Sequence, residues 1–479
     1  IVEASARYDG TSRFASGSRW GFFPSASAAW RFSEEPFFSS VRNVITNGKI
    51  RFSAGSLGNQ QVSNYYYLTK VSSDNTMSYT FDRSSKAAYS SVSAPVSSGL
   101  TWETVTTYDL GLDLNFLDNR LSFVGDYFIR DTKDMLTASV ELPATYGATS
   151  PKENCANLRT KGWEISIDWK DSFKLLGKQA TYSVSLGIGD NKTVITKYYN
   201  PTGTLSSNYK GKTLGDMWGY RIDGLFQSDE EAAEYMSRID SHEIQPGPYQ
   251  ALSSSLGTGL KAGDPKFRDL NGDGKITSGA GTLDDPGDRE IIGNSRPRFP
   301  YSFRLGFNWA GLDISAFFQG IAHQDWYPTG AYGGSAFWGP YSYSEVSFIA
   351  KDFMGRVYDP ETNPDGYFPR PRAFASYSSG NYNLGLGQRN DRYMQNIGYL
   401  RFKNLTVGYT LPESLTRKFY VSRLRVFFTG ENLYYWSPLK KYCTIIDPEL
   451  ANASSLNTDN TGIGYLYPKT LSFGVDVTF

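Results

Sequence analysis

Hydrophobic and polar residues alternate one by one in many short segments of this chain. The last nine residues read LSFGVDVTF, and residues 108–116 (YDLGLDLNF) and 163–169 (WEISIDW) show the same pattern. A period of two places apolar side chains on one face of a β-strand and polar side chains on the other. Similar segments begin at Tyr182, Tyr301, Leu405 and Leu424. The pattern predicts amphipathic strands, which occur both in β-sandwiches and in membrane barrels.

The lengths of the connections separate these two architectures. The short connections are LDN after Phe116, AG at 310–311, DSFKLLGK after Trp169 and PESLTRKF after Leu411. The long, polar connections cover about 58–100, 132–160, 193–298, 323–395 and 435–468. Short turns at one end and long extracellular loops at the other are typical of outer-membrane barrels. We therefore predict an all-β fold, a transmembrane antiparallel β-barrel to which this chain contributes about twelve strands.

In such a barrel the Leu, Val and Phe faces of the strands meet lipid and the polar faces line a lumen. The aromatic content supports this arrangement, because Phe, Trp and Tyr make up 15% of the chain and aromatic rings concentrate at membrane interfaces. Trp30, Phe116, Trp169, Trp309 and Tyr409 all lie near predicted short-turn ends. We expect them to form an interfacial girdle.

Charge and chain ends add three further expectations. The 48 basic and 48 acidic residues balance, so no nucleic-acid partner is indicated. No apolar run reaches the roughly 18 residues of a membrane-spanning helix. The chain begins without Met, at IVEASARYDG, and already alternates there. We expect it to be the C-terminal part of a longer polypeptide, with any signal sequence upstream.

Five blocks follow one another along the chain: RYDGTSRF with GFFPSASAAWRFSEEPFF (7–38), LTWETVTTYDLGLDLNF (100–116), GDPKFRDLNGDGKIT (263–277), YLRFKNLTVGYTLP (399–412) and LRVFFTGENLYYW (424–436). In this order they resemble the SusC-like (SusC/RagA-type) TonB-dependent transporters of Bacteroidetes. The resemblance covers the whole chain and implies a nutrient importer for oligosaccharides or peptides, not an enzyme. It also implies a barrel of about 22 strands around an N-terminal plug domain. The remaining strands and the plug would then be more of this chain or a second chain.

The same resemblance implies partners. A SusD-like surface lipoprotein would cover the extracellular mouth, and the TonB–ExbB–ExbD complex would act through the missing N-terminal part, where the family carries a TonB box. Outer-membrane lipid would surround the strands. The last strand resembles the signal that outer-membrane proteins present to the barrel-assembly machinery. This likeness assigns Phe479 a role in assembly and places the C-terminus in the periplasm.

One local motif, DLNGDGKIT, matches the first half of an EF-hand-like calcium loop, in which oxygen ligands at odd positions converge around a glycine turn. Position twelve of the loop, which requires a bidentate acid, is Ala280. The candidate ligands are Asp269, Asn271, Asp273, the Lys275 carbonyl and, for the missing acid, Asp284, Asp285 or Asp288. We expect Ca²⁺ or Mg²⁺ that stiffens the loop. The alternative is a turn without metal, whose carboxylates accept hydrogen bonds from backbone N–H groups.

Aromatic residues gather in the longest connections and are candidates for stacking on sugars or contacting a lid. They are Trp326, Tyr327, Tyr332, Trp338, Tyr341 and Tyr343, followed by Tyr367, Tyr377 and Tyr382. The alternative for each ring is packing within the loops or anchoring at the interface. The nearby arginines either bind peptide carboxylates or pair with acids of the loops: Arg370, Arg372, Arg389 and Arg392.

Signatures of enzymes are absent from the sequence. The two histidines, His242 and His323, belong to no HExxH motif, and no GxSxG motif occurs. Cys155 and Cys443 fall in predicted external loops, where either a disulfide or two free thiols is compatible with the compartment. Three functions remain: an energised importer, a passive outer-membrane porin and an outer-membrane hydrolase. The five blocks favour the importer, and the cargo stays undetermined.

Overall fold

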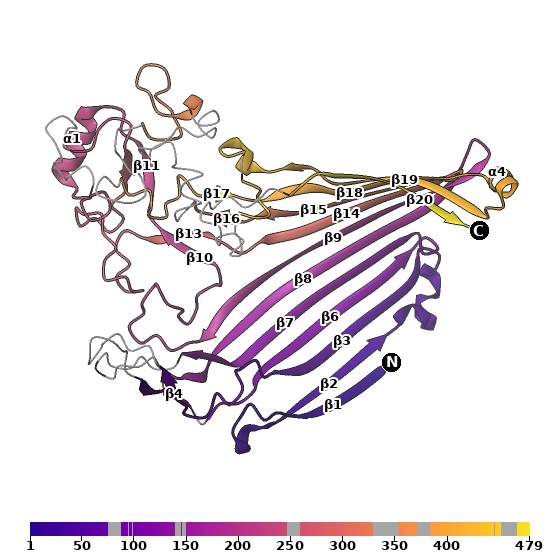
Figure 1. Ribbon diagram of the computed structural model, residues 1–479, viewed down its shortest axis with the longest axis horizontal. Helices are drawn as coiled ribbons and strands as arrows, with labels where there is room; N and C mark the ends of the chain where they lie inside the picture. Colours follow the sequence, from indigo (N-terminus) through magenta and orange to yellow (C-terminus); the bar gives the residue numbers. More distant parts are fainter. Residues whose placement is uncertain are drawn as a thin grey trace. The chain divides into compact units, whose positions relative to one another are not determined.

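The computed structural model describes residues 1–74, 88–93, 95–97, 99–138, 145, 150–246, 259–328, 354–370, 384–444, 446–451 and 467–479. Twelve of its strands form one antiparallel sheet, in the order β1-β2-β3-β6-β7-β8-β9-β14-β15-β18-β19-β20 (Figure 1). Each strand pairs with the next sheet strand along the chain, and β1 and β20 form the two edges. The all-β prediction and the count of about twelve strands are confirmed.

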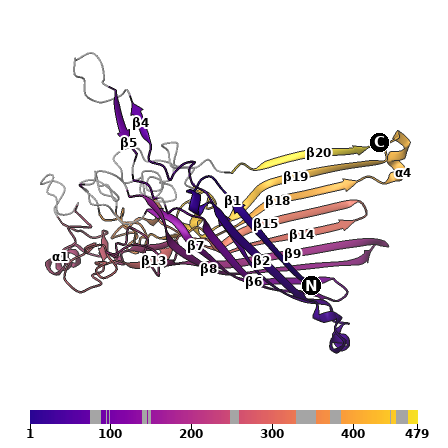
Figure 2. The same ribbon diagram turned by 90° about the horizontal axis from the view of Figure 1, so that it is seen from below.

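The sheet strands have the following bounds: β1 Val2–Gly10, β2 Trp20–Trp30, β3 Ile45–Asn59, β6 Glu103–Phe116, β7 Leu121–Ala138, β8 Lys152–Leu175, β9 Lys178–Lys197, β14 Arg298–Trp309, β15 Leu312–His323, β18 Tyr399–Thr410, β19 Arg423–Trp436 and β20 Thr470–Thr478. Four small two-stranded sheets lie in the connections, namely β4 (Val71–Asp74) with β5 (Tyr89–Val92), β10 (Asp216–Gly219) with β13 (Glu290–Asn294), β11 (Ile222–Leu225) with β12 (Pro265–Phe267) and β16 (Asp325–Trp326) with β17 (Gln395–Asn396). Figure 2 shows the β4–β5 hairpin projecting beyond the ends of the strands that flank it in sequence.

Among the residues that the structure describes, helices are few and short. They are α1 (Asp229–Arg238), α4 (Glu413–Thr416) and the 3-10 helices η1 (Ser16–Ser18), η2 (Phe32–Glu34), η3 (Pro36–Val41), η7 (Met354–Arg356), η8 (Arg417–Phe419) and η9 (Pro438–Lys441). The first residues of α1 form a capping arrangement. The Ser228 side chain accepts the Glu231 N–H at 3.1 Å, and the Glu231 side chain accepts the Gln227 N–H at 2.7 Å. Among the described residues, none of the helices is both long and apolar enough to span a membrane.

The short turns agree with the sequence at most positions. Ala310 and Gly311 join β14 to β15 with φ of 50° and 91°, as a two-residue hairpin turn requires. The prediction of a longer turn after Trp169 is wrong, because β8 continues to Leu175 and only Leu176 and Gly177 form the turn. Polar residues such as those in DSFKLLGK do not end a strand as long as the backbone ladder continues. The connection 139–151 is also shorter than the 132–160 predicted.

The two faces of the strands differ in exposure. Large apolar side chains of the strands are exposed, among them Leu110 (54%) and Phe473 (83%). Registers place apolar residues opposite apolar residues, for example Leu305 opposite Ala316 and Phe307 opposite Ile314. A bulge at Lys403 shifts the register of β18, so that Phe402 and Leu405 share one face opposite Phe318 and Ala316. The exposed apolar face matches a strand that meets lipid.

The chain forms two compact units. One comprises Ile1–Ile165, Asn191–Thr202 and Ser207–Thr213, and the other comprises Ser166–Asp190, Gly203–Ser206 and Leu214–Phe479. The second unit contains the main hydrophobic core. We call it the loop core, and its buried side chains come from the connections 198–297, 324–398 and 437–469, for example Phe226, Phe267, Tyr327, Leu386 and Leu439.

Candidate functional site

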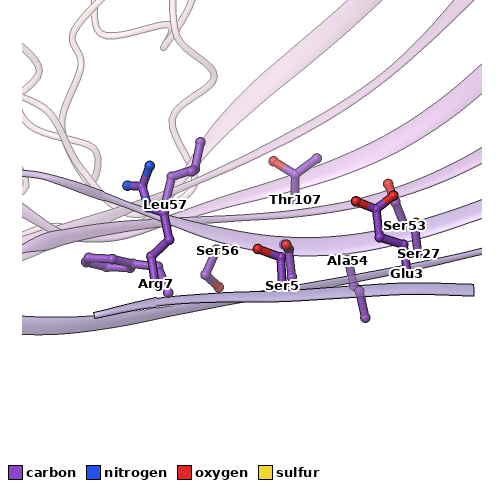
Figure 3. A pocket seen from close by; sticks show the side chains of 13 residues that line it. Glu3, Ser5, Arg7, Ser27, Ser53, Ala54, Ser56, Leu57 and Thr107 are labelled. Carbon is purple, nitrogen blue, oxygen red and sulfur yellow. The ribbon is translucent and has the colours of Figure 1, made fainter. Parts of the chain in front are cut away.

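A cavity of about 430 Å³ lies on one face of β1, β2, β3 and β6 in the first unit. Most of its lining side chains are small and polar. They are Glu3, Ser5, Arg7, Phe23, Ser25, Ala26, Ser27, Ser53, Ala54, Gly55, Ser56, Leu57 and Thr107. In Figure 3, Arg7 lies toward one end of the cavity and Glu3 toward the other, with Ser5 and Thr107 between them.

The strand registers explain why these residues meet. Ser5 is the cross-strand partner of Ser25, Ser25 of Gly55, and Gly55 of Thr107. One residue pair further along, Glu3, Ser27, Ser53 and Asp109 form a parallel row. Because side chains alternate between faces, both rows lie on the polar face. The segments VEASARYDG, PSASAAW and RFSAGS therefore build a floor of hydroxyl groups that we call the serine floor.

The serine floor is chemically suited to binding rather than to covalent chemistry. Ser and Thr hydroxyls both donate and accept hydrogen bonds, and the small side chains leave room above the sheet. Glu3 at one end and Arg7 at the other add opposite charges. Such a surface fits a polar ligand with many hydroxyl or amide groups.

Beside the serine floor, Arg51 of β3 bridges two acids on neighbouring strands. Its guanidinium lies 2.8 Å from Asp113 of β6 and 2.8 Å from Asp126 of β7, and Lys49 reaches Asp113 at 2.7 Å. Gly111 lies between Arg51 and Asp126 in the register. A Cβ at Gly111 would approach the guanidinium to 2.5 Å. The glycine thus provides the space that lets the arginine lie flat over the sheet.

The second unit contains the same arrangement. Arg425 of β19 pairs with Asp313 of β15 at 2.7 Å and with Asp476 of β20 at 3.2 Å. Gly408 of β18 lies opposite Asp313, and a Cβ there would approach the Arg425 guanidinium to 2.4 Å. Paired charges on the polar face therefore connect strands in both units.

The DLNGDGKIT loop forms a series of carboxylate-capped turns. Asp269 accepts the N–H groups of Gly272 (2.7 Å) and Gly274 (2.9 Å), and Asp273 accepts that of Lys275 (2.8 Å). The side-chain Oδ1 of Asn271 accepts the Asp273 N–H at 3.0 Å. These contacts match the capped turn that the sequence left as an alternative. The same carboxylates keep further lone pairs that can bind a cation.

Of the three acids considered for the missing ligand, Asp288 is the one that contacts residues 269–277. It is fully buried and accepts the N–H groups of Leu270 (2.8 Å) and Thr277 (2.7 Å). Burial raises its pKa. Asp285 instead caps Ala280 at 2.8 Å, and Asp284 is exposed. In the part of the chain that the structure describes, no three His, Cys, Asp or Glu residues form a group that could hold a metal ion.

Two of the six candidate aromatic residues are described, and both are buried in the loop core. Trp326 is 8% exposed and Tyr327 is 3% exposed. The Tyr327 hydroxyl donates to the Leu386 carbonyl at 2.8 Å and accepts from the Asn390 amide at 2.5 Å. Packing accounts for both rings, as the alternative stated. The remaining candidates lie outside the described residues: Tyr332, Trp338, Tyr341, Tyr343, Arg372, Tyr377 and Tyr382.

Other candidate residues also serve the loops. Tyr367 stacks on Tyr442 with ring centroids 3.7 Å apart, and Arg392 donates to the carbonyls of Gly366 (3.0 Å) and Tyr367 (3.1 Å). Neither Cys155 nor Cys443 forms a disulfide in the part of the chain that the structure describes. Phe479 follows the last residue of β20 and is 89% exposed.

Comparison with known proteins identifies the family of this chain. Residues 1–433 match the family described as "TonB dependent receptor-like, beta-barrel". The chain belongs to this family. The barrel prediction and the resemblance to SusC-like transporters are thereby confirmed, and this family of TonB-dependent receptors is one of the bacterial outer membrane.

Relatives agree along the whole chain. "TonB-dependent receptor P3" of Formosa agariphila is 28% identical over 100% of this chain and 44% of its own length. "TonB-dependent receptor SusC" of Bacteroides thetaiotaomicron is 26% identical over 98% of this chain and 41% of its own length. The chain thus spans less than half the length of these relatives.

Solved structures show the same fold. The RagAB peptide importer in its open-open state superimposes with a TM-score of 0.68 at 20% identity, over 100% of this chain and 45% of that one. A second structure, of the RagAB peptide transporter, gives a TM-score of 0.65 at 21% identity, over 94% of this chain and 43% of that one.

Sequence reasoning missed the serine floor, although the alternating Ser residues of ASARYDG and PSASAAW were a signal for it.

Proposed function

We propose that this TonB-dependent receptor chain forms part of the wall of an importer that moves oligosaccharides or peptides across the outer membrane. The serine floor is the observation that carries the proposal. It places hydroxyl groups on the polar face of four neighbouring strands, opposite a face whose apolar side chains suit lipid. Oligosaccharides and peptides both present regularly spaced hydroxyl or amide groups that such a floor can hydrogen-bond.

Partners follow from the family. We propose a SusD-like surface lipoprotein as a lid and TonB–ExbB–ExbD as the source of energy, acting through a plug domain. Support comes from the relatives, one of which is SusC and others of which form the RagAB peptide importer. The free edges of β1 and β20 would pair with further strands, because a strand edge in hydrocarbon leaves its N–H and C=O groups without partners.

The decisive experiment measures uptake by cells that express the full-length protein. Labelled oligosaccharide and peptide mixtures should enter only while the proton-motive force and TonB are intact. Ser25→Leu, which places a larger apolar side chain on the serine floor, should reduce uptake severalfold. Ala28→Leu in β2, whose side chain lies on the opposite face and does not line the cavity, is the matched control and should leave uptake unchanged.

The passive porin is the second candidate, and the same experiment separates it from the importer. Uptake that persists after the proton-motive force is collapsed, together with steady ion conductance through the reconstituted protein, would contradict the importer and support a porin. A hydrolase would instead release products outside cells, so product analysis of the medium covers the third possibility.

We further propose that the loop 269–288 binds Ca²⁺ or Mg²⁺ as a stiffening ion. Support comes from the spacing of Asp269, Asn271 and Asp273, which is that of the first half of an EF-hand-like calcium loop. EDTA should speed proteolysis within 269–288, and Asp269→Asn should produce the same pattern without EDTA. If EDTA leaves the cleavage rate unchanged, the loop is the metal-free capped turn.

A further inference from the structure

An aromatic surface runs across four strands on the apolar face of the second unit. Phe303 of β14, Phe318 of β15 and Phe402 of β18 stack in a row, with centroid distances of 4.4 and 4.3 Å and interplanar angles of 11° and 8°. Tyr434 of β19 is the cross-strand partner of Phe402. Trp436 packs edge-on against Tyr434 at 4.8 Å. We call these five rings the aromatic row.

The outer end of the aromatic row is open. Tyr434 is 47% exposed and Trp436 is 49% exposed, and Trp436 is the last residue of β19. Rings of this type at the end of a membrane strand lie where hydrocarbon gives way to headgroups. The row therefore runs across the strands, from Phe303 of β14 to the open end at Tyr434 and Trp436 of β19.

Two lysines stand at that open end. Lys440 of η9 places its Nζ 4.4 Å from the Tyr434 ring centroid and 3.7 Å from that of Tyr435, and donates to the Tyr435 carbonyl at 2.5 Å. Lys469 immediately precedes β20 and is exposed. The Pro468 carbonyl accepts a hydrogen bond from the Asn432 side chain of β19 at 3.3 Å, so Lys469 lies beside the end of β19 that precedes Lys440. Burial lowers the pKa of the Lys440 amine, and the charge of Lys469 lowers it further.

Two acids near these lysines are already engaged. Asp447 pairs with Arg401, and Glu449 lies 2.8 Å from Arg401 and 3.2 Å from Lys403. Within the described residues, no acidic side chain lies within ion-pair distance of Lys440 or Lys469. The two amines leave an excess of positive charge beside lipid-facing rings.

We propose that Lys440 and Lys469 bind the phosphate headgroup of a membrane lipid whose acyl chains lie along the aromatic row. Charge complementarity selects an anion, and the adjoining rings select one that carries hydrocarbon chains. Long lysine side chains characteristically hold their amines at the headgroup level while their stems follow apolar surface. A phosphate monoester suits two amines, since it carries more charge than a diester.

A purely structural role explains only half of the arrangement. The contacts of Lys440 with two rings and a carbonyl would stabilise η9 without any ligand. Lys469 is exposed, and within the described residues no ring or carbonyl contact of that kind holds its amine. Two like charges on neighbouring segments favour a shared anion.

The test uses native mass spectrometry of the full-length protein in detergent, titrated with dioleoyl phosphatidic acid or dioleoyl phosphatidylcholine. One phosphatidic acid should be retained in clear preference to phosphatidylcholine. Lys440→Gln with Lys469→Gln should weaken that binding about 25-fold, from about fivefold per lysine near an anionic headgroup. Lys418→Gln, at a short turn of the same unit, is the matched control and should bind normally.

Two further variants separate the effect of charge from the effect of lost folding. Lys440→Arg with Lys469→Arg retains both charges and should bind within about threefold of the original protein. Lys469→Gln alone disturbs no packing and should still weaken binding severalfold, which covers the case in which the double variant fails to fold. Equal retention of both lipids, or unchanged binding by the double glutamine variant, would overturn the proposal. Displacement of the lipid by excess inorganic phosphate would also overturn it, because the site would then recognise a free anion.

Discussion

The strands of the sheet and the loop core treat apolar side chains in opposite ways. In the loop core Phe226 and Phe267 are 0% and 1% exposed, whereas Phe473 of β20 is 83% exposed. Water drives the burial of rings in the loop core. The exposed rings of the strands would be unfavourable in water and are favourable in hydrocarbon. One chain thus contains a region that buries its apolar side chains from water and a region that exposes them to lipid. The apolar face of a strand therefore predicts a contact with lipid and not a buried core.

What holds each region together differs accordingly. The loop core depends on side-chain packing, as in a water-soluble domain. The strands depend on the backbone ladder and on charges of the polar face, such as Arg51 between Asp113 and Asp126. Substitutions should therefore reveal different costs in the two regions.

The largest effect is expected from Phe267→Ala. The Phe267 ring packs edge-on against Tyr220 at 5.8 Å, and burial raises the pKa of Tyr220 to about 12. Removing a buried Phe side chain costs about 3–5 kcal/mol. Hydrogen exchange should accelerate across the described parts of 214–297, while Phe473→Ala should leave exchange in that region unchanged. Similar acceleration by both variants would remove the distinction between the regions.

The next effect tests the two faces of one strand. Leu112→Arg should cost about 2–4 kcal/mol if Leu112 lies near the middle of the membrane. Thr107→Arg, on the polar face of the same strand, should cost less than about 1 kcal/mol. Asp113 is unsuitable as the polar control, because it pairs with Lys49 and Arg51. Denaturant unfolding of the full-length protein in lipid vesicles measures both variants, and equal losses would contradict the assignment of faces.

A smaller effect is expected from Gly111→Ala. The new methyl group would meet the Arg51 guanidinium and separate it from Asp126, at a cost of about 1–3 kcal/mol. Gly187→Ala is the matched control, because its Cβ would meet only the Ser302 hydroxyl at 3.4 Å. The melting temperature in detergent compares the two variants. If Gly111→Ala and Gly187→Ala have the same melting temperature, the contacts of Arg51 do not stabilise the sheet.

The smallest effect on stability is expected from Phe479→Ala, because the ring is 89% exposed. The free energy of unfolding, derived from thermal melts, should change by less than about 0.5 kcal/mol. If the terminal ring is an assembly signal, the amount of protein in the outer membrane should nevertheless fall severalfold. Polar residues appended after Phe479 should cause the same loss. Normal outer-membrane yield for both variants would leave the ring without a role in assembly.

The sequence was informative wherever local alternation determines the structure. The turn at Ala310 and Gly311 and the alternating strands around it follow from a period of two. The turn at Leu176 and Gly177 lies later than the local pattern predicts, because the hydrogen-bonded ladder of β8 continues past the polar residues after Trp169. Strand ends depend on pairing with neighbours, which a local pattern does not contain.

The loop core could not be predicted from local sequence patterns for a related reason. Tyr327 contacts Leu386 and Asn390, about sixty residues away, so its burial depends on contacts between distant parts of the connection 324–398. Helix α1 carried a recognisable capping signal at Ser228 and Glu231. The serine floor needed the strand registers, since Ser5 and Thr107 meet only across four strands.

The composition of the loop core constrains how this receptor diversifies. Phe267, Tyr327 and Leu439 come from three separate connections, yet all three belong to one core. A change of volume in one connection must be matched in the other two. Connections of relatives should therefore be inherited and exchanged as a set, and a chimaera that receives a single one should lose the order of all three.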